Sequence, residues 1–111
     1  MALKGSGGHT QTETLIRNLL RDALRDDGWY VFYVMQGLGS TPGISDLCCV
    51  KAGRTVWLEV KTPKGRLTNG QNVFERDVKR HGGEYRVAKG IRDITDMLDQ
   101  RTLYEYGLEA D

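Results

Sequence analysis

Three polar residues near the middle of the chain, Asp46, Glu59 and Lys61, have the types and the spacing of a site for phosphate chemistry. Asp46 belongs to the segment ISDLCCVK and the other two belong to RTVWLEVK, and both segments are rich in residues that favour strands. Ala52-Gly53 between them predicts a two-residue hairpin turn. Counting outward from that turn places Asp46 directly opposite Glu59, with Cβ atoms about 5 Å apart.

Two carboxylates that face each other destabilise a sheet unless something compensates for their repulsion. Lys61 lies two residues beyond Glu59 and therefore projects from the same face. This group suits Mg²⁺ or Mn²⁺, because such cations prefer carboxylate oxygens, polarise a phosphoryl oxygen and lower the pKa of a bound water. An ammonium group beside them can orient that water or offset charge on the phosphate. The alternative interpretation is a ladder of ion pairs along an exposed strand face.

Two further polar residues, Glu13 and Gln71, each share a helix face with apolar residues three to seven positions further on. Their side chains should therefore point toward the protein. Both residues also fit a capping box, Thr10 with Glu13 and Thr68 with Gln71, in which the third helical residue returns to the helix start. Each is predicted to cap its helix, to reach the site, or to do both.

Periodicity and turn residues divide the chain into elements that fit a mixed α/β fold. The first helix, over residues 11–27, is expected to bury one stripe of side chains: Leu15, Ile16, Leu19, Leu20, Ala23 and Leu24. The other expected elements are strands over 29–35, 44–51 and 54–61, a helix from 68 to about 81, a strand over 84–89 and a helix over 91–98. The order α-β-β-β-α-β-α predicts a mixed sheet flanked by helices.

The length and composition predict one globular domain. The chain has 111 residues, 39% hydrophobic and 28% charged, which suffices for one core without disulfide or metal staples. Residues 1–9 are interpreted as a flexible, glycine-rich leader that an expression tag could supply, and residues 10–111 as the domain. No apolar stretch predicts a membrane span or a signal peptide. The adjacent Cys48 and Cys49 cannot form a disulfide framework, and they favour a reducing compartment, the cytoplasm.

The net charge of +1 conceals an uneven distribution. Residues 51–92 hold 11 Lys or Arg against 4 Asp or Glu, whereas residues 93–111 hold 1 against 6. The basic middle could follow a phosphate backbone, and the acidic end is expected to face away from it. The candidate DNA-binding residues in the basic middle are Lys64, Arg66, Lys79 and Arg80. An unevenly charged, solvated surface is the alternative.

The run from Gly43-Ile-Ser-Asp46 to Glu59-Val-Lys61 resembles the signature of the PD-(D/E)XK nucleases. The following stretch, TPKGRLTNGQNVFERDVKRHGGEYRVAK, is similar to the VRR-NUC branch, the virus-type replication-repair nuclease domain. Members of that branch show a GxPD element, an ExK strand, a Gln that opens the next helix and a GG-x-Y/A-x-V strand. The resemblance spans roughly residues 11–98. Ser45 replaces the family's proline, which supplies no ligand, so the site is expected to survive.

The resemblance implies a restriction-endonuclease-like fold and a nuclease that depends on Mg²⁺ or Mn²⁺. It implies that Asp46, Glu59 and the backbone carbonyl of Val60 bind the metal. Lys61 would act on the water or the phosphate, with Gln71 and Glu13 as supporting catalytic residues.

Small stand-alone proteins of this branch, from phages and bacteria, resemble Holliday-junction resolvases, which are homodimers that cut branched DNA. We therefore expect a homodimeric, structure-specific DNA endonuclease that works in the cytoplasm of a bacterial or phage-infected cell. A general or restriction-like duplex nuclease and a catalytically inactive DNA-binding module on the same fold are the alternatives. The C-terminal segment TLYEYGLEAD is predicted to be either an interface arm or a tail folded onto its own domain.

Overall fold

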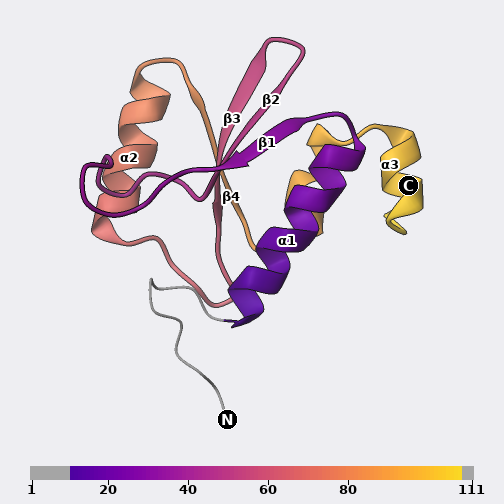
Figure 1. The fold of residues 1–111 in the computed structure, drawn as a ribbon, viewed down its shortest axis with the longest axis horizontal. Coiled ribbons are helices and arrows are strands. Elements are labelled where there is room, and N and C mark those ends of the chain that lie inside the picture. Colours follow the sequence, from indigo (N-terminus) through magenta and orange to yellow (C-terminus); the bar gives the residue numbers. More distant parts are fainter. Residues whose placement is uncertain (1–10, 109–111) are drawn as a thin grey trace.

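Four strands form one mixed sheet in the computed structural model, which describes residues 11–108 (Figure 1). The strands are β1 (Tyr30–Tyr33), β2 (Leu47–Lys51), β3 (Arg54–Val60) and β4 (Glu84–Ala88), and the helices are α1 (Gln11–Asp26), α2 (Asn69–Arg80), the 3₁₀ helix η1 (Ile91–Met97) and α3 (Gln100–Glu105). β1, β2 and β3 are antiparallel neighbours, and β4 runs parallel to β3. The predicted mixed α/β class is confirmed, while the leader lies outside the described residues. None of the helices in the described part is long and apolar enough to cross a membrane.

The hairpin between β2 and β3 has the predicted two-residue turn. Lys51 pairs with Arg54 and Leu47 pairs with Leu58, which confirms the predicted register. Ala52 and Gly53 have φ values of 51° and 82°. Positive φ at both central residues matches the right-handed twist of the flanking strands and keeps the pairing free of a bulge. The hairpin therefore carries its side chains to the faces that the sequence predicts.

The main hydrophobic core lies between α1 and one face of the sheet. The helix contributes Leu20, Ala23 and Leu24, all fully buried. The sheet contributes alternate strand residues, which are Val31, Leu47, Cys49, Val56, Leu58, Val60 and Ala88. Cys48, on the opposite face, is buried as well, and neither cysteine forms a disulfide. The prediction for Leu15 and Leu19 was wrong: they are 64% and 42% exposed, because α1 meets the sheet along a narrower arc centred on Leu20 and Leu24.

The C-terminal segment folds back onto its own domain. Leu103 and Leu108 are buried in the core, whereas Tyr104 is 72% exposed. Of the two predicted alternatives, the tail folded onto its own domain therefore holds for these two leucines. The helix predicted over 91–98 is the 3₁₀ helix η1, interrupted at Ile94 (φ −122°), and α3 after it was not predicted.

A buried carboxylate, Asp27, holds this segment in place. Its Oδ1 accepts hydrogen bonds from the backbone N–H of Asp99 (2.8 Å) and the hydroxyl of Thr102 (2.7 Å). Its Oδ2 accepts one from Nζ of Lys51 (2.7 Å). Burial acts to raise the pKa of Asp27, but these hydrogen bonds outweigh it and bring the pKa below its ordinary value. One side chain thus joins the end of α1, strand β2 and the start of α3.

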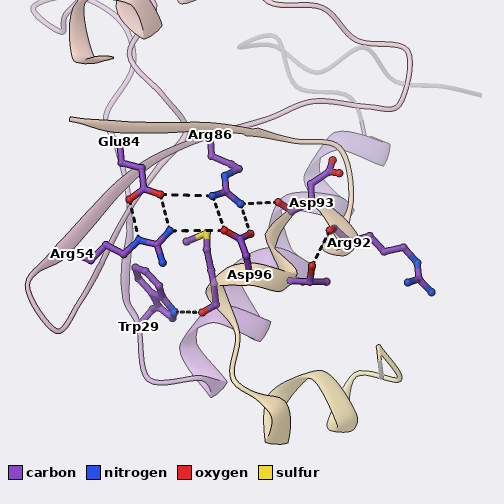
Figure 2. Close-up of polar contacts among 9 residues, drawn as sticks. Trp29, Arg54, Glu84, Arg86, Arg92, Asp93 and Asp96 are labelled. Atoms are coloured by element: carbon purple, nitrogen blue, oxygen red, sulfur yellow. Dashed lines mark hydrogen bonds and ion pairs between the residues drawn. The ribbon is translucent and has the colours of Figure 1, made fainter. Parts of the chain in front are cut away.

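An ion-pair network joins the basic middle of the chain to its acidic end (Figure 2). Arg54 donates to both carboxylate oxygens of Glu84, at 2.9 and 2.6 Å. Arg86 donates to both oxygens of Asp96, at 2.5 and 2.9 Å. The guanidinium of Arg54 also lies 5.6 Å from the ring centroid of Trp29. Because η1 packs beside β4, Asp96 of the acidic end neutralises two arginines of the basic middle.

Candidate active site

Asp46 and Glu59 meet beside the open end of the β2–β3 hairpin. Asp46 directly precedes β2, Glu59 is the penultimate residue of β3, and the two are only 6% and 2% exposed. Oδ2 of Asp46 accepts a hydrogen bond of 2.9 Å from the backbone N–H of Val60. Within the described part of the chain, the buried Oε1 of Glu59 has no hydrogen-bond partner. The alternative of an exposed ladder of ion pairs is excluded, because both carboxylates are buried.

The surroundings of Glu59 disfavour its ionised form. Burial, and after it the negative charge of Asp46, raises the pKa of Glu59 to about 8, while Lys61 acts in the opposite direction. Without a cation, Glu59 therefore holds its proton to a higher pH than an ordinary carboxyl does. A cation that binds here would have to displace that proton, since carboxylates coordinate metals in their ionised form.

Lys61 lies beside the carboxylate pair. Its Nζ is 3.7 Å from Oε2 of Glu59, and its side chain is only 13% exposed. Its backbone N–H donates to the carbonyl of Ala88 (3.0 Å), which extends the β3–β4 pairing past the end of β3. This pairing with β4 keeps Lys61 in line with β3, so its ammonium group lies near Glu59 on the face that the strand alternation predicts.

Gln71 performs both of the functions that the sequence leaves open. Its side-chain oxygen accepts from the backbone N–H of Thr68 (2.9 Å), and its own N–H donates to the Thr68 hydroxyl (3.2 Å), which completes a capping box. Its side-chain nitrogen donates to Oε2 of Glu59 (3.1 Å). For Glu13, the predicted capping partner Thr10 lies outside the described residues.

The loop that leads into Asp46 packs directly on the start of α2. Gly43 has a φ of +74°, and a Cβ atom there would lie 2.1 Å from the carbonyl oxygen of Gly70. Only glycine allows two backbones to approach this closely. Ser45, which stands where the resemblance leads one to expect proline, is fully buried and donates its hydroxyl to a nearby backbone carbonyl (3.1 Å). The glycine contact therefore fixes the position of Asp46 relative to Gln71.

Two more side chains act on the carboxylate pair from other elements. Glu13 of α1 is 8% exposed, and its negative charge contributes to the raised pKa of Glu59. Tyr85 of β4 was not predicted; its hydroxyl is buried with no hydrogen-bond partner among residues 11–108. Burial, and then the charge of Glu59, raises the pKa of Tyr85. A signal for it exists in the sheet register, because Val87 pairs with Glu59 and Tyr85 shares its face of β4.

The donor set fits a hard divalent cation with few protein ligands. Asp46 and Glu59 offer carboxylate oxygens. The N–H of Val60 points to Asp46, so the Val60 carbonyl lies on the same edge of β3, since both backbone groups of a strand residue point to one side. In the described part of the chain, no three His, Cys, Asp or Glu side chains cluster closely enough to hold a metal. A cation here would retain several waters, as Mg²⁺ usually does, and Glu13 would act without ligating it.

The four predicted DNA-binding residues are all exposed. They are Lys64 and Arg66, between β3 and α2, and Lys79 and Arg80, in the last turn of α2. Arg66 lines a shallow hollow of about 410 Å³ together with Lys89. Lys79 pairs with Glu75 at 2.8 Å. It lies roughly 12 Å along α2 from Gln71, at 1.5 Å per residue. Arg66 lies beside the start of α2, because Asn72 of the first helical turn lines the same hollow.

Comparison with known proteins adds no family assignment. No family model matches the sequence, and no curated protein matches it significantly.

Proposed function

We propose that this chain is a divalent-metal-dependent nuclease that hydrolyses phosphodiester bonds in DNA. The observation that carries the proposal is the buried pair of Asp46 and Glu59, with the ammonium of Lys61 3.7 Å from Glu59. Burying two adjacent carboxylates is unfavourable unless a proton or a cation neutralises them. The mixed sheet and the hairpin-borne carboxylates agree with the PD-(D/E)XK superfamily and its VRR-NUC branch, to which the motifs are similar.

In the proposed reaction, a water oxygen forms a bond to phosphorus, the bond from phosphorus to the leaving sugar oxygen breaks, and that oxygen takes up a proton. Mg²⁺ or Mn²⁺, when bound, supplies the Lewis acidity that polarises the phosphoryl oxygen and lowers the pKa of the attacking water. Asp46, Glu59 and the carbonyl of Val60 would hold the cation. Lys61 would orient the water or offset the negative charge that develops on the phosphate.

Gln71 and Glu13 would support this group without touching the phosphate. The amide of Gln71 fixes the orientation of the Glu59 carboxylate through its 3.1 Å hydrogen bond, as outer hydrogen bonds commonly do for metal ligands. Glu13 adds negative charge near Glu59, which favours a bound cation over an empty pair.

The resemblance implies that the substrate is branched DNA and that the active form is a homodimer. A chain of 111 residues offers little surface for reading sequence. Two copies would present two sites to the two strands of a junction. Ordinary duplex DNA is the alternative substrate, and a DNA-binding module without activity is the alternative function. The presence of Asp46, Glu59 and Lys61 together favours activity, because a decayed site usually loses one of its residues.

Cleavage of a labelled four-way junction, compared with a linear duplex of matching sequence in Mg²⁺ or Mn²⁺, tests the proposal. We expect preferential cutting of the junction and a loss on the order of 10²-fold or more in Asp46→Asn and in Lys61→Ala. Glu105→Gln, an exposed carboxylate of α3, serves as the matched control and should retain full activity. Equal cutting of the duplex would favour the general nuclease. Junction binding without cleavage in either metal would contradict the catalytic proposal.

A further inference from the structure

Three arginines of α1, Arg17, Arg21 and Arg25, follow one another at intervals of four residues and so lie along one face of the helix. Two of them converge on a single ring. The guanidinium carbons of Arg17 and Arg21 lie 5.3 and 6.0 Å from the ring centroid of Tyr33 on β1. Tyr33 itself is 45% exposed, so the cluster lies at the surface. Like charges at this spacing repel each other, and their convergence requires a reason.

Acidic partners supply that reason only in part. Arg21 pairs with Asp22 at 2.8 Å, across the exposed surface of the helix. Arg17 forms no ion pair with any residue of the range 11–108, and its buried Nε has no hydrogen-bond partner there. Arg54 and Arg86 differ in this respect, because each lies between two carboxylates (Figure 2). Arg17 is thus a cation without an ion pair among residues 11–108, and it lies outside the segment that a count of charges along the chain favours.

The strand and the helix that hold this cluster both lead to the carboxylate pair. The N–H of Val34, the residue after Tyr33, donates 2.9 Å to the backbone carbonyl of Asp46. Along α1, Arg17 is about one turn, or roughly 6 Å, from Glu13, whose charge acts on the second carboxylate of the site. The cluster thus adjoins the pair through both elements, while the ring of Tyr33, opposite Leu47, and the side chain of Asp46 point to opposite faces of the sheet.

We propose that Arg17 and Arg21, held on the ring of Tyr33, bind backbone phosphates of the DNA strand that enters the carboxylate site. The inference rests on the proposed nuclease function and adds a contact surface to it. A guanidinium binds phosphate through two parallel hydrogen bonds, which suits it better than an ammonium. An aromatic ring orients a guanidinium without neutralising its charge. Tyr33 also accepts a hydrogen bond from Arg21 (2.5 Å), which fixes one of the two groups before any ligand binds.

Binding of a labelled four-way junction over a range of NaCl concentrations tests the inference, with every variant made in an Asp46→Asn background so that binding is measured without cleavage. Each lost phosphate contact lowers the slope of log affinity against log salt by about 1. We expect that loss, with weaker binding, for Arg17→Gln and for Arg21→Gln. Arg17→Lys should keep most of the slope but lose affinity, because it retains the charge and lacks the planar fork. Arg101→Gln, on the exposed surface of α3, is the control and should change neither quantity.

Thermal unfolding of each variant establishes that it is folded. If Arg17→Gln does not fold, Arg21→Gln and Arg17→Lys decide the question. Any of three results would overturn the inference. They are an unchanged slope and affinity in the folded variants, an equal loss in Arg101→Gln, and no junction binding by the parent protein. Wild-type cleavage with unchanged slopes would refute the arginine contacts alone. Reduced slopes without any wild-type cleavage would refute the nuclease proposal alone.

Discussion

The side-chain amide of Gln71 donates a 3.1 Å hydrogen bond to Oε2 of Glu59 while the oxygen of the same amide caps α2. One residue therefore couples the start of a helix to a buried carboxylate on the neighbouring strand. Because the cap fixes the amide plane, it also fixes the direction from which Glu59 receives its hydrogen bond. The helix start and the candidate site should respond together to substitutions at this position.

Replacing Gln71 with alanine should therefore lower both stability and activity. We expect Gln71→Ala to reduce the free energy of unfolding by about 1–2 kcal/mol, through loss of the cap and of the bond to Glu59. Nuclease activity should fall by about 10-fold or more, as for other groups that orient metal ligands. Thr68→Val removes the other half of the capping box, so it should cost about 1 kcal/mol and leave kcat unchanged. Equal kcat values for the two variants would show that Gln71 acts only as a cap.

The raised pKa of Glu59 predicts an unusual dependence of stability on pH. The folded protein holds the Glu59 proton more tightly than the unfolded chain does. The contribution of this proton to the free energy of unfolding is therefore fully present below the ordinary pKa of 4.5 and is lost as pH rises through about 8. In the absence of metal, Glu59→Gln should be more stable than wild type at pH 8, by an amount on the order of 4 kcal/mol. The difference should vanish below about pH 4.5. Urea unfolding across this range measures it, and parallel profiles for the two proteins would contradict the assignment.

The contact between Gly43 and Gly70 predicts a large effect from one methyl group. Gly43→Ala would place a Cβ atom 2.1 Å from the Gly70 carbonyl oxygen and would also strain a residue at φ +74°. We expect a loss of several kcal/mol, from about 1–3 for overpacking and about 1–2 for the backbone. Gly39→Ala is the matched control, because φ is +89° and no atom lies within 4 Å of the added carbon. Gly39→Ala should lose only the stability that the strained backbone costs, about 1–2 kcal/mol. Similar unfolding midpoints for the two variants would count against the close contact.

Asp27 should be among the most sensitive positions outside the candidate site. Asp27→Ala leaves Lys51, Thr102 and the N–H of Asp99 without their shared acceptor, so we expect a loss of about 3–5 kcal/mol. Because the pKa of Asp27 is lowered on folding, its stabilisation is present above the unfolded pKa and is lost as pH falls through the folded one. Acid unfolding of wild type and Asp27→Asn should therefore converge at low pH. A constant difference down to pH 2 would contradict this linkage.

The hairpin and the positions of Asp46 and Glu59 could be predicted because local rules determine them. A two-residue turn fixes which residues of β2 and β3 face each other, so the position of Asp46 beside Glu59 follows from Ala52-Gly53 alone. The capping box of Gln71 is likewise a pattern of four consecutive residues. Periodicity identified the helix α1 but not which part of its apolar stripe meets the sheet. Leu15 and Leu19 are exposed because that depends on the packing angle.

The features that escaped prediction depend on contacts between distant segments. Asp27 meets Thr102 across 75 positions, and nothing near either residue indicates the other. Asp96 meets Arg86 only because η1 folds beside β4. Likewise, the convergence of Arg17 and Arg21 on Tyr33 requires the pairing of α1 with the edge strand. A charge count along the chain assigned the basic surface to residues 51–92 alone, since it cannot show which arginines the fold neutralises.

Calorimetric titration of Mn²⁺ into wild type and Glu59→Gln at pH 7, in two buffers of different ionisation enthalpy, tests the central claim most directly. The variant keeps the shape of the site and its hydrogen bond to Gln71 but cannot ionise. We predict that wild type binds Mn²⁺ and releases close to one proton per ion, because the pKa of Glu59 is about 8, and that the variant loses the binding. Equal binding by both proteins, or no binding by wild type, would contradict a cation site at Asp46 and Glu59.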